Sequence, residues 1–263
     1  MANVKVIVIR TAGTNCDRET AFAFEKAGAK PEFVHINELT RKEKNLDNYH
    51  IMAIPGGFTY GDDIASGKIL ANELKYKIAG AIHKFIKDGK LIIGICNGFQ
   101  VLVKAGLLPN LKGDGQTVES TLTLNDSDKF EDRWVYLKNV ESGCIWTKDI
   151  KKIIELPVAH GEGKFIPKDK NILNIMKEKK LVVFEYVDQK GNKAGYPHCP
   201  SGSIENIAGI CDLTGRIFGL MPHPERHISY YQHPNWTRRY KKESTGDGFA
   251  IFENGVSYAR RHL

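Results

Sequence analysis

The chain has 263 residues, of which 41% are hydrophobic and 26% charged, so it has the composition of an ordinary globular protein with enough apolar residues for a sizeable core. Its formal net charge is +7, but the lysines alternate with acids, as in RKEK at 41–44, which indicates a solvated surface and no nucleic-acid partner. No apolar run approaches the roughly 20 residues that cross a bilayer, and MANVKVIVIR at the start leads straight into a strand-like run without a cleavable signal pattern. We therefore expect a cytoplasmic protein without a membrane partner.

The first half of the chain alternates strand-like and helix-like patterns. This alternation predicts parallel βαβ units, and the continuous apolar character of the strands predicts that both faces of the sheet are covered. The expected strands are 4–9, 32–36, 50–57 and 91–96, and the expected helices are 17–28, 69–89 and 98–106.

From about residue 115 the pattern changes to strands separated by turns, and helical patterns are scarce. A turn at LTG between two apolar runs predicts a hairpin. The expected strands are 117–126, 133–140 and 180–188, the hairpin joins 204–212 to 216–226, and a last helix at 246–263 docks back on the sheet. We predict one α/β domain over 1–263, with a mainly parallel open sheet flanked by helices and an antiparallel extension in the second half.

The cysteines are odd in number and contain no CxxC pair, which argues against a disulfide framework and a structural zinc site. We accordingly predict no metal in this chain and consider each thiol by its own surroundings. The five are Cys16, Cys96, Cys144, Cys199 and Cys211.

Cys96 lies where an apolar run ends, in GICNGFQ at 94–100. Gly94 and Gly98 flank it in the spacing of a nucleophile elbow, a tight strand-to-helix turn that tolerates no bulky neighbours. The first N–H groups of the helix would favour a thiolate there and later an oxyanion. From this motif alone, the alternative is a buried cysteine beside a glycine-bearing turn.

A nucleophilic thiol needs a base, and the base needs an orienting group. MPHPERH at 221–227 offers His223 with Glu225 two positions later. Pro222 and Pro224 fix the backbone, and on an extended chain positions i and i+2 point the same way. The sequence therefore predicts a Cys96–His223–Glu225 triad, the alternative being a surface loop whose histidine and glutamate face water.

Two glycine-containing loops accompany these motifs. PGGFTYGDD at 55–63 ends a strand, and its backbone amides around Gly57 and Phe58 would supply the other half of an oxyanion hole. It lacks the GxxxxGK[ST] pattern of a phosphate loop, and its two aspartates would repel phosphate. AHGEGKF at 159–165 either closes over a ligand or is a plain surface turn.

Together, PGG, GICNGFQ and H-P-E resemble a class I, triad-type glutamine amidotransferase. Longer segments are similar to the glutaminase subunits of phosphoribosylformylglycinamidine synthase, an enzyme of purine biosynthesis. They are TAGTNCDRET (11–20), GGFTYGDDIASGKI (56–69), NDSDKFEDRWVYL (125–137), VAHGEGKF (158–165) and IAGICDLTGRIFGLMPHPERH (207–227). The resemblance covers essentially the whole chain and implies a flavodoxin-like class I amidotransferase fold in a single domain.

The resemblance also implies roles for individual residues. Cys96 matches the nucleophile, His223 the general base and acid, and Glu225 the orienting carboxylate. The substrate-binding positions implied are the backbone amides of Asn97 and of the Gly57 and Phe58 region, the side chain of Gln100, and the loop at Gly161 and Glu162. One departure is YPHCPSGS at 196–203, where the family more often reads NPNGS, and this leaves the contacts of Cys199 and Ser201 open.

The implied function is hydrolysis of glutamine to glutamate and ammonia. By the same resemblance, ammonia passes to a separate synthase subunit, which uses ATP to convert formylglycinamide ribonucleotide to formylglycinamidine ribonucleotide. Glutamine, that synthase subunit and a small accessory subunit are the expected partners. No cofactor is expected in this chain, and ATP and magnesium belong to the partner.

Two alternatives remain at this point. A cysteine peptidase or deglycase on a similar frame also places cysteine at an elbow, although its loops differ from PGGFTYGDD and MPHPER. A binding or scaffolding subunit would keep the fold without turnover, although all three triad members are present.

Overall fold

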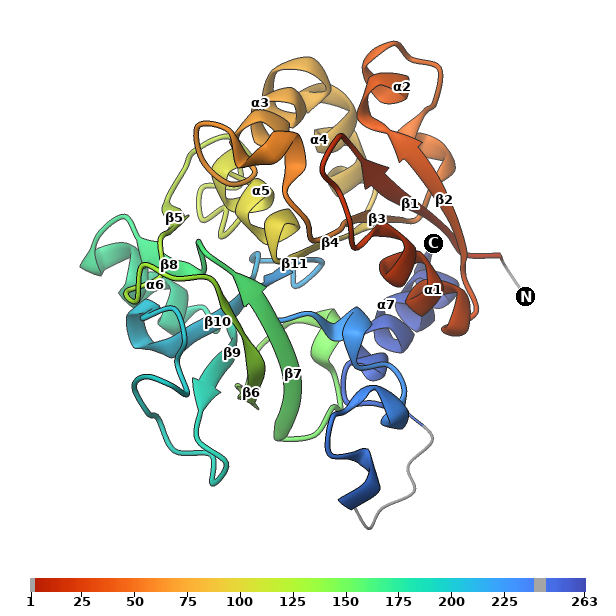
Figure 1. The fold of residues 1–263 in the computed structure, drawn as a ribbon. Coiled ribbons are helices and arrows are strands. Elements are labelled where there is room, and N and C mark those ends of the chain that lie inside the picture. Colours follow the sequence, from red (N-terminus) through yellow and green to blue (C-terminus); the bar gives the residue numbers. More distant parts are fainter. Residues whose placement is uncertain (1–2, 239–244) are drawn as a thin grey trace.

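Figure 1 shows the computed structural model, which describes residues 3–238 and 245–263; within these residues nine strands form one mixed sheet. The strand order is β2-β1-β3-β4-β11-β10-β9-β6-β7. The first five strands in this order are mutually parallel, and the pairs from β11 onward are antiparallel. The predicted α/β architecture with an antiparallel extension is therefore confirmed.

The parallel half has short, almost completely buried central strands, because helices cover both faces. Its strands are β1 (Lys5–Arg10), β2 (Lys30–His35), β3 (Ile51–Ile54), β4 (Leu91–Ile95) and β11 (Ile217–Leu220). One face carries α1 (Asp17–Lys26) and α7 (Phe249–His262), and the other carries α3 (Lys68–Lys77), α4 (Ala79–Lys87) and α5 (Asn97–Ala105). A short helix, α2 (Ile36–Thr40), follows β2.

The antiparallel half contains the predicted hairpin, β10 (Ile207–Cys211) with β11, and three further strands. These are β6 (Glu131–Asn139), β7 (Ile153–His160) and β9 (Val182–Val187). The predicted strand at 117–126 differs, because β5 (Ser120–Thr123) pairs only with β8 (Lys164–Pro167) in a separate two-stranded sheet. Phe165 of β8 stacks on Phe99 of α5 with ring centroids 6.0 Å apart, so this small sheet packs on a helix instead of extending the main one.

Two helical predictions need correction. The expected helix 69–89 is two helices, because Ile78 adopts φ −129° and ψ 19°, outside the helical region. The break lets α3 pack on α5 while α4 packs on the segment before β3. A helix in the second half was missed: α6 (Lys170–Glu178) begins at Asp169, whose carboxylate accepts a 2.8 Å hydrogen bond from the N–H of Ile172.

The sheet brings the carboxyl ends of several strands to one edge. Because β1, β3, β4 and β11 run in parallel, the segments that follow them meet there. The last helix, α7, packs on α1, and Phe252 contacts Phe24 edge to face at 5.0 Å. Among the described residues no helix is both long and apolar enough to span a membrane.

Candidate active site

Cys96 occupies a strained turn between β4 and α5. Its φ of 51° and ψ of −104° lie outside the regions that side chains normally adopt. A Cβ at Gly98 would lie 1.9 Å from the carbonyl oxygen of Ile54, and one at Gly94 would lie 2.5 Å from the carbonyl oxygen of Gly98. Both glycines are therefore required by close backbone contacts, and the predicted strand–turn–helix around Cys96 is present.

His223 and Glu225 lie just beyond β11, and both side chains are buried. Nδ1 of His223 donates to Oε1 of Glu225 at 2.7 Å, and the backbone N–H of His223 is bonded to the carbonyl of Pro157 at 2.8 Å. The predicted extended backbone is not what joins them, because Pro224–Arg226 forms a 3-10 turn. The side chains meet across that turn.

The pKa of His223 reflects opposing influences. Burial alone would lower it, but the carboxylate of Glu225 and the thiols of Cys96 and Cys16 raise it well above its usual range. A positive charge on the imidazole is thus stabilised at this position. The ring lies beside the thiol of Cys96.

A pocket of about 230 Å³ opens at this sheet edge, and four of the predicted site residues line it: Gly57, Phe58, Cys96 and His223. Gly56 lets the histidine approach, since a Cβ there would lie 2.7 Å from Cε1 of His223. The rings of Phe58 and Phe130, 6.2 Å apart, belong to the same wall.

The pocket also contains residues that sequence reasoning did not assign to the site: Asn15, Cys16, Asp132 and Arg226. The thiol of Cys16 accepts a 3.1 Å hydrogen bond from Nη2 of Arg226 and donates to Oδ1 of Asn15 at 3.1 Å. Burial raises the pKa of this thiol. Cys16 reaches this site because it follows β1, which lies beside β3, so that the carboxyl end of β1 opens at the same edge of the sheet.

Not all of the backbone N–H groups that were predicted to form an oxyanion hole near Cys96 are available. The N–H of Phe58 donates to the carbonyl of Gly13 at 2.9 Å, so this amide is already used, although its ring lines the pocket. The N–H of Asn97 is the first of α5 and has no acceptor within the helix. The side chain of Asn97 points away from the thiol, because its Oδ1 accepts from the hydroxyl of Thr59 at 2.7 Å.

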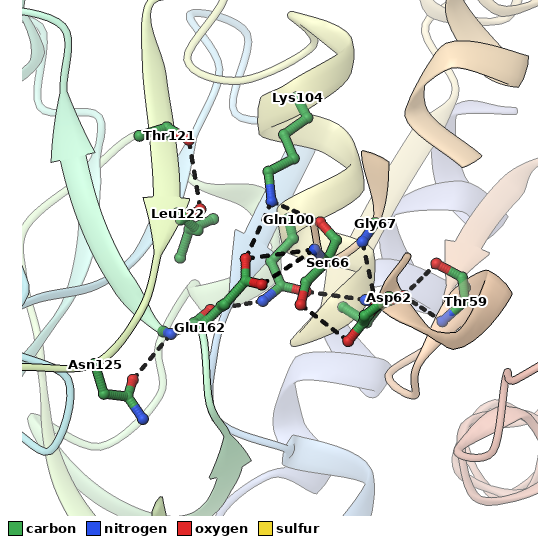
Figure 2. A network of polar contacts seen from close by, with 12 residues as sticks. Thr59, Asp62, Ser66, Gly67, Gln100, Lys104, Thr121, Leu122, Asn125 and Glu162 are labelled. Atoms are coloured by element: carbon green, nitrogen blue, oxygen red, sulfur yellow. Dashed lines mark hydrogen bonds and ion pairs between the residues drawn. The ribbon is translucent and has the colours of Figure 1, made fainter. Parts of the chain in front are cut away.

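Gln100 and Glu162 lie in a neighbouring polar network, shown in Figure 2. Nε2 of Gln100 donates to the carbonyl of Glu162 at 2.6 Å, and its Oε1 accepts from Asn97 at 2.9 Å. The carboxylate of Glu162 accepts from the N–H of Ser66 at 3.3 Å and lies 3.5 Å from Nζ of Lys104. The two predicted substrate residues thus contact each other across the network and are not part of the pocket wall.

Burial shifts the pKa values of two charged groups in this network. It lowers the pKa of Lys104, whose ammonium also donates to the carbonyl of Ser66 at 2.6 Å. It raises the pKa of Asp62, which accepts from Ser66 and Asn97. The loop 62–67, α5 and the turn between β7 and β8 are therefore held together by hydrogen bonds among partly buried polar and charged groups.

The remaining predicted residue, Gly161, lies in the β7–β8 turn, where its carbonyl accepts from the N–H of Asn125 at 2.9 Å. The segment 196–203, which departs from the family pattern, forms hydrogen bonds with the same turn and the strand after it. Ser203 accepts from the N–H of Phe165 at 3.0 Å and donates to the carbonyl of Gly163 at 3.2 Å, while Ser201 bonds to Ser203 at 2.9 Å. Cys199 is buried in this segment.

Comparison with known proteins gives a consistent family. Residues 3–259 match the family model described as a CobB/CobQ-like glutamine amidotransferase domain. The chain is 51% identical to phosphoribosylformylglycinamidine synthase subunit PurQ of Dehalococcoides mccartyi, with 99% of this chain and 100% of that protein covered. It is 44% identical to the protein of the same name from Methanococcus maripaludis strain S2, with 97% of both chains covered.

Solved structures agree with this relationship. A chain in the structure of PurLQS from Thermotoga maritima is similar at 33% identity and a TM-score of 0.74, with 98% of this chain and 99% of that chain covered. A glutamine amidotransferase from Thermotoga maritima is similar at 16% identity and a TM-score of 0.50, with 99% and 94% covered, and this likeness concerns the fold alone.

Proposed function

The chain belongs to the PurQ family of glutamine amidotransferase subunits of phosphoribosylformylglycinamidine synthase, and on that premise we propose that it hydrolyses glutamine with a Cys96–His223–Glu225 triad. The observation that carries this proposal is the placement of Cys96. Its thiol stands on a strained turn in the same pocket as His223, whose other ring nitrogen is bonded to Glu225 at 2.7 Å. The nucleophile thus shares the pocket with the base, and the base is hydrogen-bonded to the orienting group.

The proposed cycle begins with attack of the Cys96 thiolate on the carboxamide carbon of glutamine. His223, as imidazolium, gives its Nε2 proton to the departing nitrogen, and ammonia leaves as a glutamyl thioester forms. His223 then takes a proton from water, whose oxygen attacks the thioester carbon. Collapse of this intermediate releases glutamate and regenerates the thiolate–imidazolium pair.

Charge that develops on the carbonyl oxygen needs backbone donors. We assign this role to the N–H of Asn97, at the start of α5, together with the backbone of Gly57. The backbone N–H of Phe58 has a partner in Gly13, so Phe58 is assigned a contact through its ring only. Gln100, Gly161 and Glu162 would then bind the amino-acid end of glutamine after the network between them opens.

The names of the relatives support a proposal for the fate of the ammonia. The relatives are named as subunits of phosphoribosylformylglycinamidine synthase, and one similar chain comes from a PurLQS complex. We propose that this chain likewise supplies ammonia to a synthase subunit, with a small accessory subunit, and that ATP and magnesium bind to the partner. We further propose that the complex works in the cytoplasm on formylglycinamide ribonucleotide.

The test compares Cys96→Ala with Cys144→Ala, a buried thiol outside the pocket, in the complex reconstituted with the synthase subunit. Cys96→Ala is expected to lose glutamine-dependent amidine formation by at least about 10³-fold but to retain synthesis from added ammonium salt. Cys144→Ala is expected to retain both. Full glutamine-dependent synthesis by Cys96→Ala would show that the nucleophile is wrongly assigned.

A further inference from the structure

Asn125 is a buried residue that the proposed cycle does not use, and its side chain ties together the turn between β7 and β8. The residue is 1% exposed. Its Nδ2 donates to the carbonyls of His160 at 2.7 Å and of Lys129 at 2.9 Å. Its Oδ1 accepts from the N–H of Gly163 at 3.0 Å and from Nδ1 of His160 at 3.0 Å. Every donor and acceptor position of this amide is therefore used.

These bonds also fix the ring of His160. A backbone carbonyl only accepts, so the two carbonyls identify the nitrogen of the Asn125 amide, and its oxygen must accept from the imidazole. Nδ1 of His160 therefore carries a proton. The ring lies against the turn, because a Cβ at Gly163 would come within 2.3 Å of it. Asn125, His160 and Gly163 consequently form one packed unit, which we call the turn clamp.

The turn clamp lies between the nucleophile and the predicted substrate residues. On one side of it, the thiol of Cys96 donates to the carbonyl of Ala159 at 3.6 Å, and both residues line the pocket. On the other side, the carbonyl of Glu162 accepts from Nε2 of Gln100 at 2.6 Å. Figure 2 shows Asn125 beside the turn that carries Glu162. The clamp therefore holds the backbone that carries both contacts.

We propose that Asn125 is a positioning residue for glutamine binding, which acts by holding the backbone of Gly161 and Glu162 in the geometry that receives the amino-acid end of the substrate. The backbone of Asn125 contributes as well, since its N–H donates to the carbonyl of Gly161 at 2.9 Å. A turn that is already ordered loses less conformational entropy when the substrate binds, so the clamp increases affinity more than it accelerates the chemical step. The inference rests on the proposed function, because it takes glutamine as the substrate.

The test replaces Asn125 by aspartate, which keeps the shape of the side chain but has no N–H to donate to the two carbonyls. The matched control is Asn254→Asp in α7, outside the pocket wall, because Nδ2 of Asn254 likewise donates to two backbone carbonyls, those of Trp146 and Lys148. In the reconstituted complex, Asn125→Asp should raise KM for glutamine about tenfold and change kcat less than about threefold, whereas Asn254→Asp should change neither. An unchanged KM in Asn125→Asp, a loss confined to kcat, or an equal rise of KM in both variants would overturn the proposal.

A second test asks whether Asn125 acts through the turn. The carboxylate of Glu162 anchors the same turn at the N–H of Ser66 and beside Lys104. Because Asn125→Asp and Glu162→Ala would loosen one common element, the double variant should raise KM little more than either single change. Independent effects would multiply to roughly 100-fold, and a value near that would show that Asn125 does not act on this turn.

Denaturant unfolding of each full chain establishes that the variants are folded under the conditions of the assay. Should Asn125→Asp not fold, Asn125→Ser and Asn254→Ser take the place of the two aspartate variants, since a serine hydroxyl can still donate to one carbonyl, and the same difference between KM and kcat is expected. A wild-type complex that forms no glutamate from glutamine would defeat the proposed function and this inference with it. An active wild type beside an Asn125→Asp variant with unaltered KM would defeat this inference alone.

Discussion

Nδ1 of His223 donates a 2.7 Å hydrogen bond to Oε1 of Glu225, and both side chains are buried. An ionised carboxylate can only accept, so this bond fixes the proton of the neutral ring on Nδ1 and leaves Nε2 to exchange protons with the pocket. The pair therefore determines which ring nitrogen of the imidazole exchanges protons during the reaction.

Replacement of Glu225 by glutamine tests that relationship. The neutral amide neither stabilises the imidazolium nor enforces the tautomer, so kcat for glutamine-dependent synthesis should fall about 10³- to 10⁴-fold with little change in KM. Steady-state kinetics of the reconstituted complex give both constants, with ammonia-dependent synthesis as the control for folding and assembly. A decrease of only a few-fold would mean that Glu225 does not orient the base.

The turn at Cys96 predicts a large steric penalty at Gly98. In Gly98→Ala the new Cβ would lie 1.9 Å from the carbonyl oxygen of Ile54, and neither backbone can yield easily. The free energy of unfolding should fall by about 3 kcal/mol. The matched control is Gly80→Ala in α4, where a Cβ meets nothing within 4 Å and stability should rise by up to about 1 kcal/mol. Denaturant unfolding measures both, and similar values for the two variants would contradict the steric argument.

Glu162 links the turn after β7 to the loop at Ser66 and to Lys104. In Glu162→Ala these contacts are lost, and the carbonyl that holds Gln100 is free to move. We expect KM for glutamine to rise about tenfold, which corresponds to about 1.4 kcal/mol of binding, with a smaller effect on kcat. Glu178→Ala, at an exposed position of α6, is the control. An unchanged KM in Glu162→Ala would remove this residue from the substrate site.

The sequence predicts most of this site because its main motifs carry local signals. The glycines around Cys96 are required by backbone contacts within a few residues or with one neighbouring strand. The prolines on either side of His223 restrict its local backbone. These residues therefore indicate the geometry themselves. Cys16 was not placed in the site, because its contact with the triad depends on β1 lying beside β3. That pairing is a tertiary property.

Other differences between the sequence predictions and the structure also arise from tertiary contacts. The break at Ile78 follows from α3 and α4 packing on different partners, which the uniform helical pattern of 69–89 does not indicate. The direct bond from Gln100 to Glu162 depends on distances between separate elements, and spacing along the chain contains no information on them. In contrast, α6 had a usable signal in Asp169, a helix-capping residue before an apolar periodic run.

We predict that His160 contributes to the loss of stability of the protein at acid pH. Burial, with a smaller effect of His223, lowers the pKa of His160 to about 3, and its Nδ1 bonds to Oδ1 of Asn125 at 3.0 Å. Unfolded histidine titrates near pH 6.5, so between about pH 6.5 and 3 the unfolded state binds a proton that the folded state does not. The stability from this neutral histidine is therefore fully present above about pH 6.5 and is lost as the pH falls toward 3.

The measurement is the free energy of unfolding as a function of pH for the wild type and His160→Gln. The wild-type curve should fall more steeply below about pH 6.5, by up to about 1.4 kcal/mol per pH unit, because one extra proton is taken up on unfolding. The variant loses a buried hydrogen bond and should be less stable at neutral pH, yet the difference between the curves should shrink as the pH falls. The matched control is His262→Gln, at an exposed position near the end of α7. A His160→Gln curve that runs parallel to the wild type would show that His160 is not held neutral in the folded protein.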